Sequence, residues 1–350
     1  MRILKRIIAL AAAALLSLTV LSSCNNKEPI TPAKKDNIEK HERENGIVCW
    51  GSSLAYGAYG EDRSIVNTIE NHMMSDENYI PIVNMGVPRE TSQTVMARAG
   101  AVDIVVSKKF TVPAGIEPVE ITFSAKDKSK ISPLRYGTSC DGGMTNVTVA
   151  GLEGTLSVAR DSAQRNEPKY YFTRNVEGEE IEIKKGDRII SESMTEYKSY
   201  IPIVCIGDCG EWENTKDLIK QQQKIIDTCE NKDKFIIIGL FSAPVDIDPE
   251  MSEKEALAAQ KKANEAFDKA MVKQWGDHYV NIREYLCSDE AIEKAKAQEI
   301  EITDQDMNNV KNKIVPDIFK YDADNLNGYA YDIIGDIVYD KLVELGYLFH

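Results

Sequence analysis

The sequence predicts an α/β fold in which a doubly wound parallel sheet is interrupted by an inserted all-β module. Short apolar runs alternate with amphipathic helical segments in the first and last parts of the chain, which is typical of a parallel sheet with helices on its faces. Residues 105–199 show two-residue alternation and frequent turn residues instead. We therefore expect an α/β domain, residues 45–104 and 200–350, with the module inserted in it.

The first α/β segment contains two expected strands and two expected helices. Strands are predicted over residues 47–51 and 80–85, where apolar runs end at or just before a glycine. A helix is predicted over residues 64–74 because apolar residues recur there every three to four positions. A second helix is expected over residues 91–101.

The inserted module is predicted from short alternating runs. Residues 119–123, 147–149 and 181–183 alternate apolar and polar side chains, and glycine or proline lies between such runs. No set of residues that resembles a catalytic site occurs inside this module.

The α/β pattern resumes after the module. Three apolar runs and three helical patterns alternate, which extends the parallel sheet by right-handed crossovers. The expected strands are residues 201–206, 235–240 and 279–282, and the expected helices are residues 215–229, 252–275 and 329–345.

The N-terminal residues predict an exported, lipid-anchored protein. A basic start precedes an apolar run over residues 7–21, which is shorter than the roughly 20 residues of a membrane-spanning helix. Leu21-Ser-Ser-Cys24 then resembles the lipobox of bacterial lipoproteins. That resemblance implies a signal peptide over residues 1–24, acylation of Cys24 and attachment to a bacterial membrane, facing the periplasm or the cell surface. The polar stretch 25–44 is expected to be a flexible tether.

Composition and charge argue against several classes of binding partner. The 350 residues carry a formal net charge of -14, so the chain lacks the basic surface that nucleic-acid binding requires. Its seven cysteines match no zinc or haem spacing, and we expect neither metal nor cofactor. Cys49 and Cys205 lie inside apolar runs and are expected to be buried thiols.

Four motifs occur where strands are expected to end or helices to begin. They are GSSL at residues 51–54, NMGVPRETS at residues 84–92, GDCGEW at residues 207–212 and DADNLN at residues 322–327. In open parallel sheets, ligands bind outside the carboxyl ends of the strands. We therefore expect the four motifs to meet at one site.

In this order, the motifs resemble the four blocks of the SGNH (GDSL-type) ester hydrolases. Those blocks read Gly-Asp-Ser-Leu, Asn-x-x-x-x-Gly-Asp-Thr-Ser, Gly-x-Asn-Gly and Asp-x-x-His-Leu-Asn. The resemblance covers about residues 45–104 and 200–349 and implies the flavodoxin-like SGNH hydrolase fold, with the β-rich module as an insertion. It implies that Ser53 is the nucleophile and that Asp322 orients the general base. The residues implied to bind substrate or the oxyanion are Gly86, Arg89, Gly207, Asp208, Cys209 and Trp212.

Three positions depart from the family pattern. Asn325 stands at the histidine position, and an amide cannot act as a general base near neutral pH. Cys209 stands at the oxyanion asparagine, and a thiol is a poor hydrogen-bond donor; losing one such donor typically costs about 10²–10³ in rate. Arg89 stands at the glycine position. Its backbone N–H is kept and its guanidinium is able to bind an anion, but its Cβ is expected to strain a turn built for glycine.

Other ways of activating Ser53 remain open. Asp322 or Asp208 would serve as the base if burial raised its pKa. Cys209 is a less favourable nucleophile, because a neighbouring carboxylate raises the pKa of a thiol. The histidines are all expected at the opposite edge of the sheet, in structural or solvent-exposed positions: His41, His72, His278 and His350.

Two functions from different classes follow, together with a role for the module. The first is a serine ester hydrolase, using Ser53, that acts on acylated carbohydrates or lipids with atypical chemistry. The second, which the three departures favour, is a ligand- or glycan-binding lipoprotein with no turnover, whose pocket Tyr56, Arg89, Trp212 and Asn325 would line. A third interpretation gives the module its own protein or glycan contacts.

Overall fold

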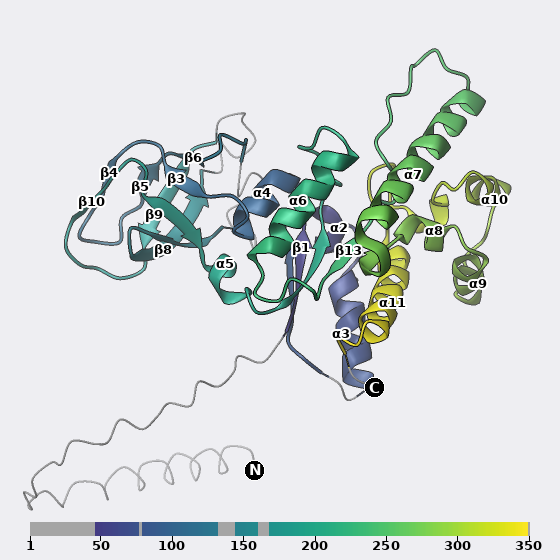
Figure 1. Cartoon of the computed structure of the whole chain (residues 1–350), viewed down its shortest axis with the longest axis horizontal. Coiled ribbons are helices and arrows are strands. Elements are labelled where there is room, and N and C mark those ends of the chain that lie inside the picture. Colours follow the sequence, from purple (N-terminus) through teal and green to yellow (C-terminus); the bar gives the residue numbers. More distant parts are fainter. Residues whose placement is uncertain (1–45, 77–78, 132–143, 160–167, 349–350) are drawn as a thin grey trace, which may run out of the picture. The chain divides into compact units, whose positions relative to one another are not determined.

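The computed structural model describes residues 46–76, 79–131, 144–159 and 168–348 (Figure 1). The predicted signal peptide, Cys24 and the predicted tether lie outside these residues, as do His41, Cys140 and His350. Among the described helices, none combines the length and apolar character needed to cross a bilayer.

Five strands of the described residues form a parallel sheet in the order β14-β13-β12-β1-β2. Their bounds are Ile47–Gly51 for β1, Ile82–Gly86 for β2, Ile201–Cys205 for β12, Ile236–Ile238 for β13 and Tyr279–Val280 for β14. All five predicted strands are present. The last is shorter than expected because a helix begins at Ile282. Gly51 is in register with both Gly86 and Cys205, so the carboxyl ends of β1, β2 and β12 align.

Helices pack on both faces of this sheet, because successive strand residues enter two different hydrophobic clusters. Val48 and Trp50 of β1 belong to one cluster, and Ile47 and Cys49 belong to the other. The first cluster includes residues of α4 (Ser92–Arg98), α6 (Thr215–Thr228) and α7 (Glu253–Trp275). The second includes residues of α3 (Ile65–Ser75), α8 (Ile282–Leu286), α9 (Asp289–Ala297) and α11 (Gly328–Glu344). Figure 1 shows α3 and α11 side by side.

Helix starts follow local capping chemistry. Ser64 caps α3 by accepting the backbone N–H of Asn67, and Ser252 forms a capping box with Glu255 at the start of α7. The sequence patterns did not predict the short helices that follow β14. These are α8, α9, α10 (Asp304–Lys311) and the 3₁₀ turn Asp317–Phe319.

The inserted module is antiparallel. Its described strands form a seven-stranded sheet, β5-β9-β8-β7-β11-β3-β6, and a two-stranded sheet, β10-β4. The strands are β3 (Ile104–Val106), β4 (Phe110–Val112), β5 (Val119–Ile121), β6 (Phe123–Ala125), β7 (Asn146–Val149), β8 (Leu152–Val158), β9 (Tyr170–Arg174), β10 (Ile181–Ile183) and β11 (Arg188–Ser191).

Two details of the module differ from the sequence prediction. The run 119–123 is not one strand but two, because β5 pairs with β9 whereas β6 pairs with β3. The module is also not wholly β, since α5 (Glu192–Glu196) ends it.

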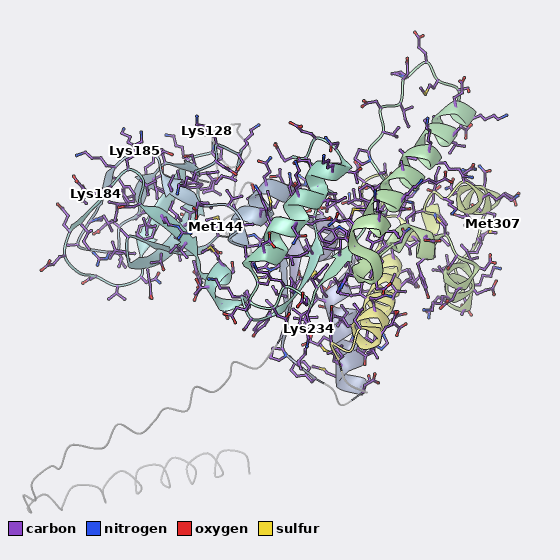
Figure 2. The ribbon with its side chains drawn as sticks, in the orientation of Figure 1. Lys128, Met144, Lys184, Lys185, Lys234 and Met307 are labelled. Carbon is purple, nitrogen blue, oxygen red and sulfur yellow. The ribbon has the colours of Figure 1, made fainter. Side chains whose placement is uncertain are left out.

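The module shares a core with one face of the α/β part. Met144 and Phe172 are fully buried in the same hydrophobic cluster as Met96 of α4. The backbone N–H of Lys130 also donates to the Gln93 side chain of α4 (3.1 Å). Figure 2 labels the buried Met144 together with the exposed lysines Lys128, Lys184 and Lys185 of the module.

Candidate functional site

A cavity of about 870 Å³ lies at the carboxyl ends of the parallel strands. Its walls come from the turns after β1, β2, β12 and β13 and from the turn before α11. Seven of the predicted site residues line it: Ser53, Arg89, Gly207, Asp208, Cys209, Asp322 and Asn325. The four motifs therefore meet at one place, as expected from the behaviour of open parallel sheets.

Ser53 is the first residue of a short helix, α2 (Ser53–Tyr56), directly after β1. Its Oγ accepts the backbone N–H of Arg89 (3.0 Å) and lies 3.7 Å from the Sγ of Cys209. The backbone N–H of Arg89 is thus directed at the hydroxyl of Ser53. A donor in such a place is able to stabilise negative charge that develops close to it.

The turn that carries this N–H adopts a glycine-like backbone. Arg89 has φ of 64°, in the left-handed region, which costs an ordinary residue about 1–3 kcal/mol. The expected strain at Arg89 is therefore present, but the turn still directs the N–H at Ser53. The arginine side chain is exposed at the pocket.

A buried ion pair between Arg98 and Glu90 holds this turn in place. Arg98 of α4 is fully buried and donates to the Glu90 carboxylate from Nε (2.8 Å). Its Nη2 donates to the backbone carbonyls of Met85 (2.8 Å) and Gly51 (3.3 Å). Burial raises the pKa of Glu90, and the charge of Arg98 opposes that rise. Arg98 thus ties together the ends of β1 and β2 and the residue after Arg89.

Asp208 is directed at the start of α2. One carboxylate oxygen accepts the Ser52 hydroxyl and the other accepts the backbone N–H of Leu54 (3.0 Å). Burial raises the pKa of Asp208, which is the condition we set for a carboxylate base. However, these two hydrogen bonds hold both oxygens at Ser52 and Leu54, so the carboxylate caps the helix that carries Ser53.

Cys209 is a protonated thiol at neutral pH. Burial, and then the nearby charge of Asp208, raise the pKa of the Cys209 thiol. Its Sγ lies 3.9 Å from a carboxylate oxygen of Asp208, to which it donates. Since the thiolate is the reactive form of cysteine, this environment makes Cys209 a poor nucleophile.

Asn325 and Asp322, the two residues of the fourth motif that line the cavity with an assigned role, form a hydrogen-bonded pair. The amide nitrogen of Asn325 donates to both carboxylate oxygens of Asp322 (2.8 and 3.0 Å). The Asn325 side chain, followed by the backbone N–H of Asp324, lowers the pKa of Asp322. Asp322 is therefore a weak base. The described hydrogen bonds of Ser53 Oγ involve Arg89 and Cys209, and neither residue of the Asp322–Asn325 pair.

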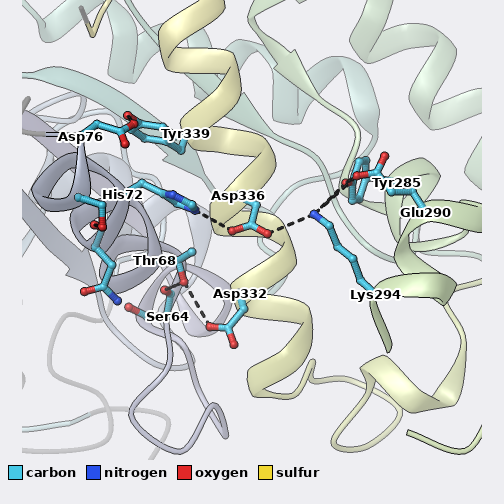
Figure 3. A network of polar contacts seen from close by, with 12 residues as sticks. Ser64, Thr68, His72, Asp76, Tyr285, Glu290, Lys294, Asp332, Asp336 and Tyr339 are labelled. Carbon is cyan, nitrogen blue, oxygen red and sulfur yellow. Dashed lines mark hydrogen bonds and ion pairs between the residues drawn. The ribbon is translucent and has the colours of Figure 1, made fainter. Parts of the chain in front are cut away.

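The two described histidines lie outside the pocket lining. His72 pairs with Asp336 (2.8 Å), which also pairs with Lys294 (3.2 Å), so the network in Figure 3 joins α3, α11 and α9. His278 contacts the carbonyl of Phe235 (3.0 Å) through its Nδ1. Both have structural partners, as we expected.

Two predicted binding residues support the pocket without lining it. Trp212 donates its indole N–H to the carbonyl of Gly207 (2.8 Å), so its polar atom is directed at the turn and not at the cavity. Gly86 lies where a Cβ would come within 2.2 Å of the backbone nitrogen of Tyr56, so β2 approaches α2 closely only with glycine there.

Several lining residues were not predicted from the motifs. They are Tyr59, Gln260, the loop of residues 240–245 and Asp324, which belongs to the fourth motif but had no predicted role. The loop follows the carboxyl end of β13, so the general rule for parallel sheets would have indicated it. The sequence carried no signal for Tyr59 or Gln260.

Within the described residues, no three or more His, Cys, Asp or Glu side chains gather in a way that could hold a metal ion. Comparison of the sequence with protein-family models and with curated proteins gives no match.

Proposed function

We propose that this chain is an exported lipoprotein with a doubly wound, SGNH-hydrolase-like scaffold that binds a small-molecule or glycan ester ligand and does not hydrolyse it efficiently. The proposal rests on the resemblance of the four motifs and on their meeting at one cavity. Ligand binding needs only a shaped pocket with a few polar groups, and the cavity of about 870 Å³ has both.

One observation supports the proposal that the ester ligand is not hydrolysed efficiently. The resemblance assigns Asn325 to the general-base position, and its side-chain nitrogen donates to both carboxylate oxygens of Asp322. Without a base, the hydroxyl of Ser53 keeps its proton, and general-base catalysis is typically worth about 10²–10⁴ in rate.

A second candidate, slow ester hydrolysis by Ser53, is favoured by the Arg89 N–H at 3.0 Å from the hydroxyl oxygen. That N–H would stabilise the oxyanion of an acyl intermediate. The base would then be Asp208, whose pKa burial raises.

Hydrolysis of short-chain aryl acetates and acetylated sugars by the full-length protein, beside its Ser53→Ala variant, separates the two candidates. We expect equal background rates from both proteins. Turnover that disappears in Ser53→Ala would contradict the proposal and establish an esterase with an unusual base.

The membrane anchor is proposed from the lipobox-like segment that ends at Cys24. We expect cells that express the full-length protein to incorporate labelled palmitate into it, and a Cys24→Ser variant to incorporate none. Cys229→Ser removes a different thiol and serves as the control, which should incorporate palmitate as the native sequence does. Equal labelling of the Cys24→Ser variant would refute the anchor without affecting the pocket.

A further inference from the structure

Three exposed tyrosines surround the mouth of the pocket. Tyr56 and Tyr59 line the cavity and are 50% and 44% exposed. Tyr321 is 61% exposed and immediately precedes Asp322, which also lines the cavity. Large aromatic side chains left in water beside a cavity mark an interaction site more often than an inert surface.

Two of these tyrosine rings stack on each other in the ligand-free structure. Tyr59 and Tyr321 stack with their centroids 4.4 Å apart and an angle of 14° between the rings. Tyr59 has φ of 63°, a backbone conformation that ordinary residues rarely adopt. The hydroxyl of Tyr331 holds the adjoining turn by donating to the carbonyl of Ala58 (2.9 Å). The stacked pair is therefore an aromatic platform that is already formed without a ligand, so binding on it requires little rearrangement.

The charges beside this platform disfavour an anionic ligand. The carboxylates of Asp322 and Asp324 line the cavity against the single guanidinium of Arg89, whereas the carboxylate of Asp208 is buried with both oxygens hydrogen-bonded. The hydrogen bonds from Asn325 and Asp324 lower the pKa of Asp322, so Asp322 is charged at neutral pH. This balance opposes the attraction of Arg89 for an anion, so a neutral ligand fits the cavity better.

We propose that the stacked Tyr59–Tyr321 pair is a binding subsite for the face of a neutral sugar ring at the mouth of the pocket. The negative face of an aromatic ring attracts the C–H groups on the flat face of a sugar. Carboxylate and amide oxygens accept hydrogen bonds from hydroxyl groups, and Asp324, Gln260 and Asn325 supply them around the cavity. This inference rests on the proposed binding function and names the class of its ligand.

Binding of a matched pair of oligosaccharides tests the subsite. Oligogalactosides and oligogalacturonates share a ring geometry and differ in the carboxylate on each ring. With the full-length protein in detergent micelles, we expect calorimetry to show binding of neutral oligosaccharides, with the oligogalactoside bound at least tenfold more tightly than the oligogalacturonate. The panel also includes neutral oligomers of glucose, mannose and xylose.

Substitutions of the two stacked tyrosines test whether sugar binding depends on the aromatic platform. Tyr59→Ala and Tyr321→Ala should each weaken binding of the neutral sugar about tenfold, the upper range for one aromatic contact. Tyr79→Ala removes a tyrosine of similar exposure (52%) that is absent from the pocket lining, and should leave affinity unchanged. Circular dichroism of each variant shows whether the fold is intact.

The outcomes separate this inference from the proposed function. Three results would each overturn the sugar subsite: tighter binding of the oligogalacturonate, an affinity for the neutral sugar that Tyr59→Ala and Tyr321→Ala leave unchanged from the native sequence, or no binding of any sugar in the panel. Ser53-dependent ester hydrolysis would overturn the non-hydrolytic function instead. In that case the KM for an acetylated neutral sugar would report binding at the subsite. Tyr59→Ala should raise this KM with little change in kcat.

Discussion

The Asn325→His variant is expected to gain ester hydrolysis, and Asn325→His with Cys209→Asn to gain more. Asn325 already points its side-chain nitrogen at Asp322 at 2.8 Å, so an imidazole there would be oriented by the same carboxylate. A correctly placed base contributes about 10²–10⁴ in rate. An amide donor in place of the Cys209 thiol, which lies 3.7 Å from Ser53 Oγ, would add about 10²–10³ through the oxyanion. Initial rates with 4-nitrophenyl acetate measure both gains.

Two controls show whether any gain is of this kind. Asn325→Gln keeps an amide at the position and should gain nothing. Adding Ser53→Ala to Asn325→His should return the rate to background. If neither the single nor the double variant hydrolyses the ester while both remain folded, then the assignment of Asn325 to the base position is wrong.

Loss of Arg98 is expected to destabilise the fold by about 3–5 kcal/mol, because it leaves Glu90 as an unpaired buried charge. Both side chains of this pair are almost completely buried, and Arg98 also satisfies two strand carbonyls. The free energy of unfolding of Arg98→Ala in urea measures the loss. Because burial raises the pKa of Glu90, the folded variant takes up a proton more readily than the unfolded chain. The destabilisation should therefore shrink as the pH falls.

A matched arginine on the surface provides the comparison. Arg188 pairs with Asp103 with 55% of its side chain exposed, and such pairs contribute about 0–1 kcal/mol. Arg188→Ala should therefore change stability little. A loss in Arg98→Ala no larger than in Arg188→Ala would contradict the role of the buried pair in holding the Arg89 turn.

The parallel sheet could be predicted because its strands are buried on both faces and appear as apolar runs. Residues 47–51 and 201–206 are such runs, and β1 and β12 occupy them almost fully. The run 119–123 was misjudged for a physical reason. Local alternation does not reveal that a chain changes its pairing partner at Thr122, since pairing is set by distant strands.

The candidate site could also be predicted from the sequence only in part. Motifs at strand ends placed Ser53, Cys209 and Asn325 together, because the carboxyl ends of parallel strands meet at one edge. The buried Arg98–Glu90 pair was not predicted, since Arg98 ends the short helix α4 and Glu90 lies in the turn before it, and their burial depends on tertiary packing. The partners of Asp208 could not be predicted either, because Ser52 lies 156 residues away in the sequence.

We propose that Ser53 lies in a ligand pocket that holds no base to activate it. Reaction with a fluorophosphonate, which modifies activated serine hydroxyls, tests this most directly when intact mass and peptide mapping follow the adduct. We expect no adduct at Ser53 in the native sequence and an adduct once Asn325→His is introduced. An adduct at Ser53 of the unmodified protein would contradict it and mean that another group in the pocket removes the proton.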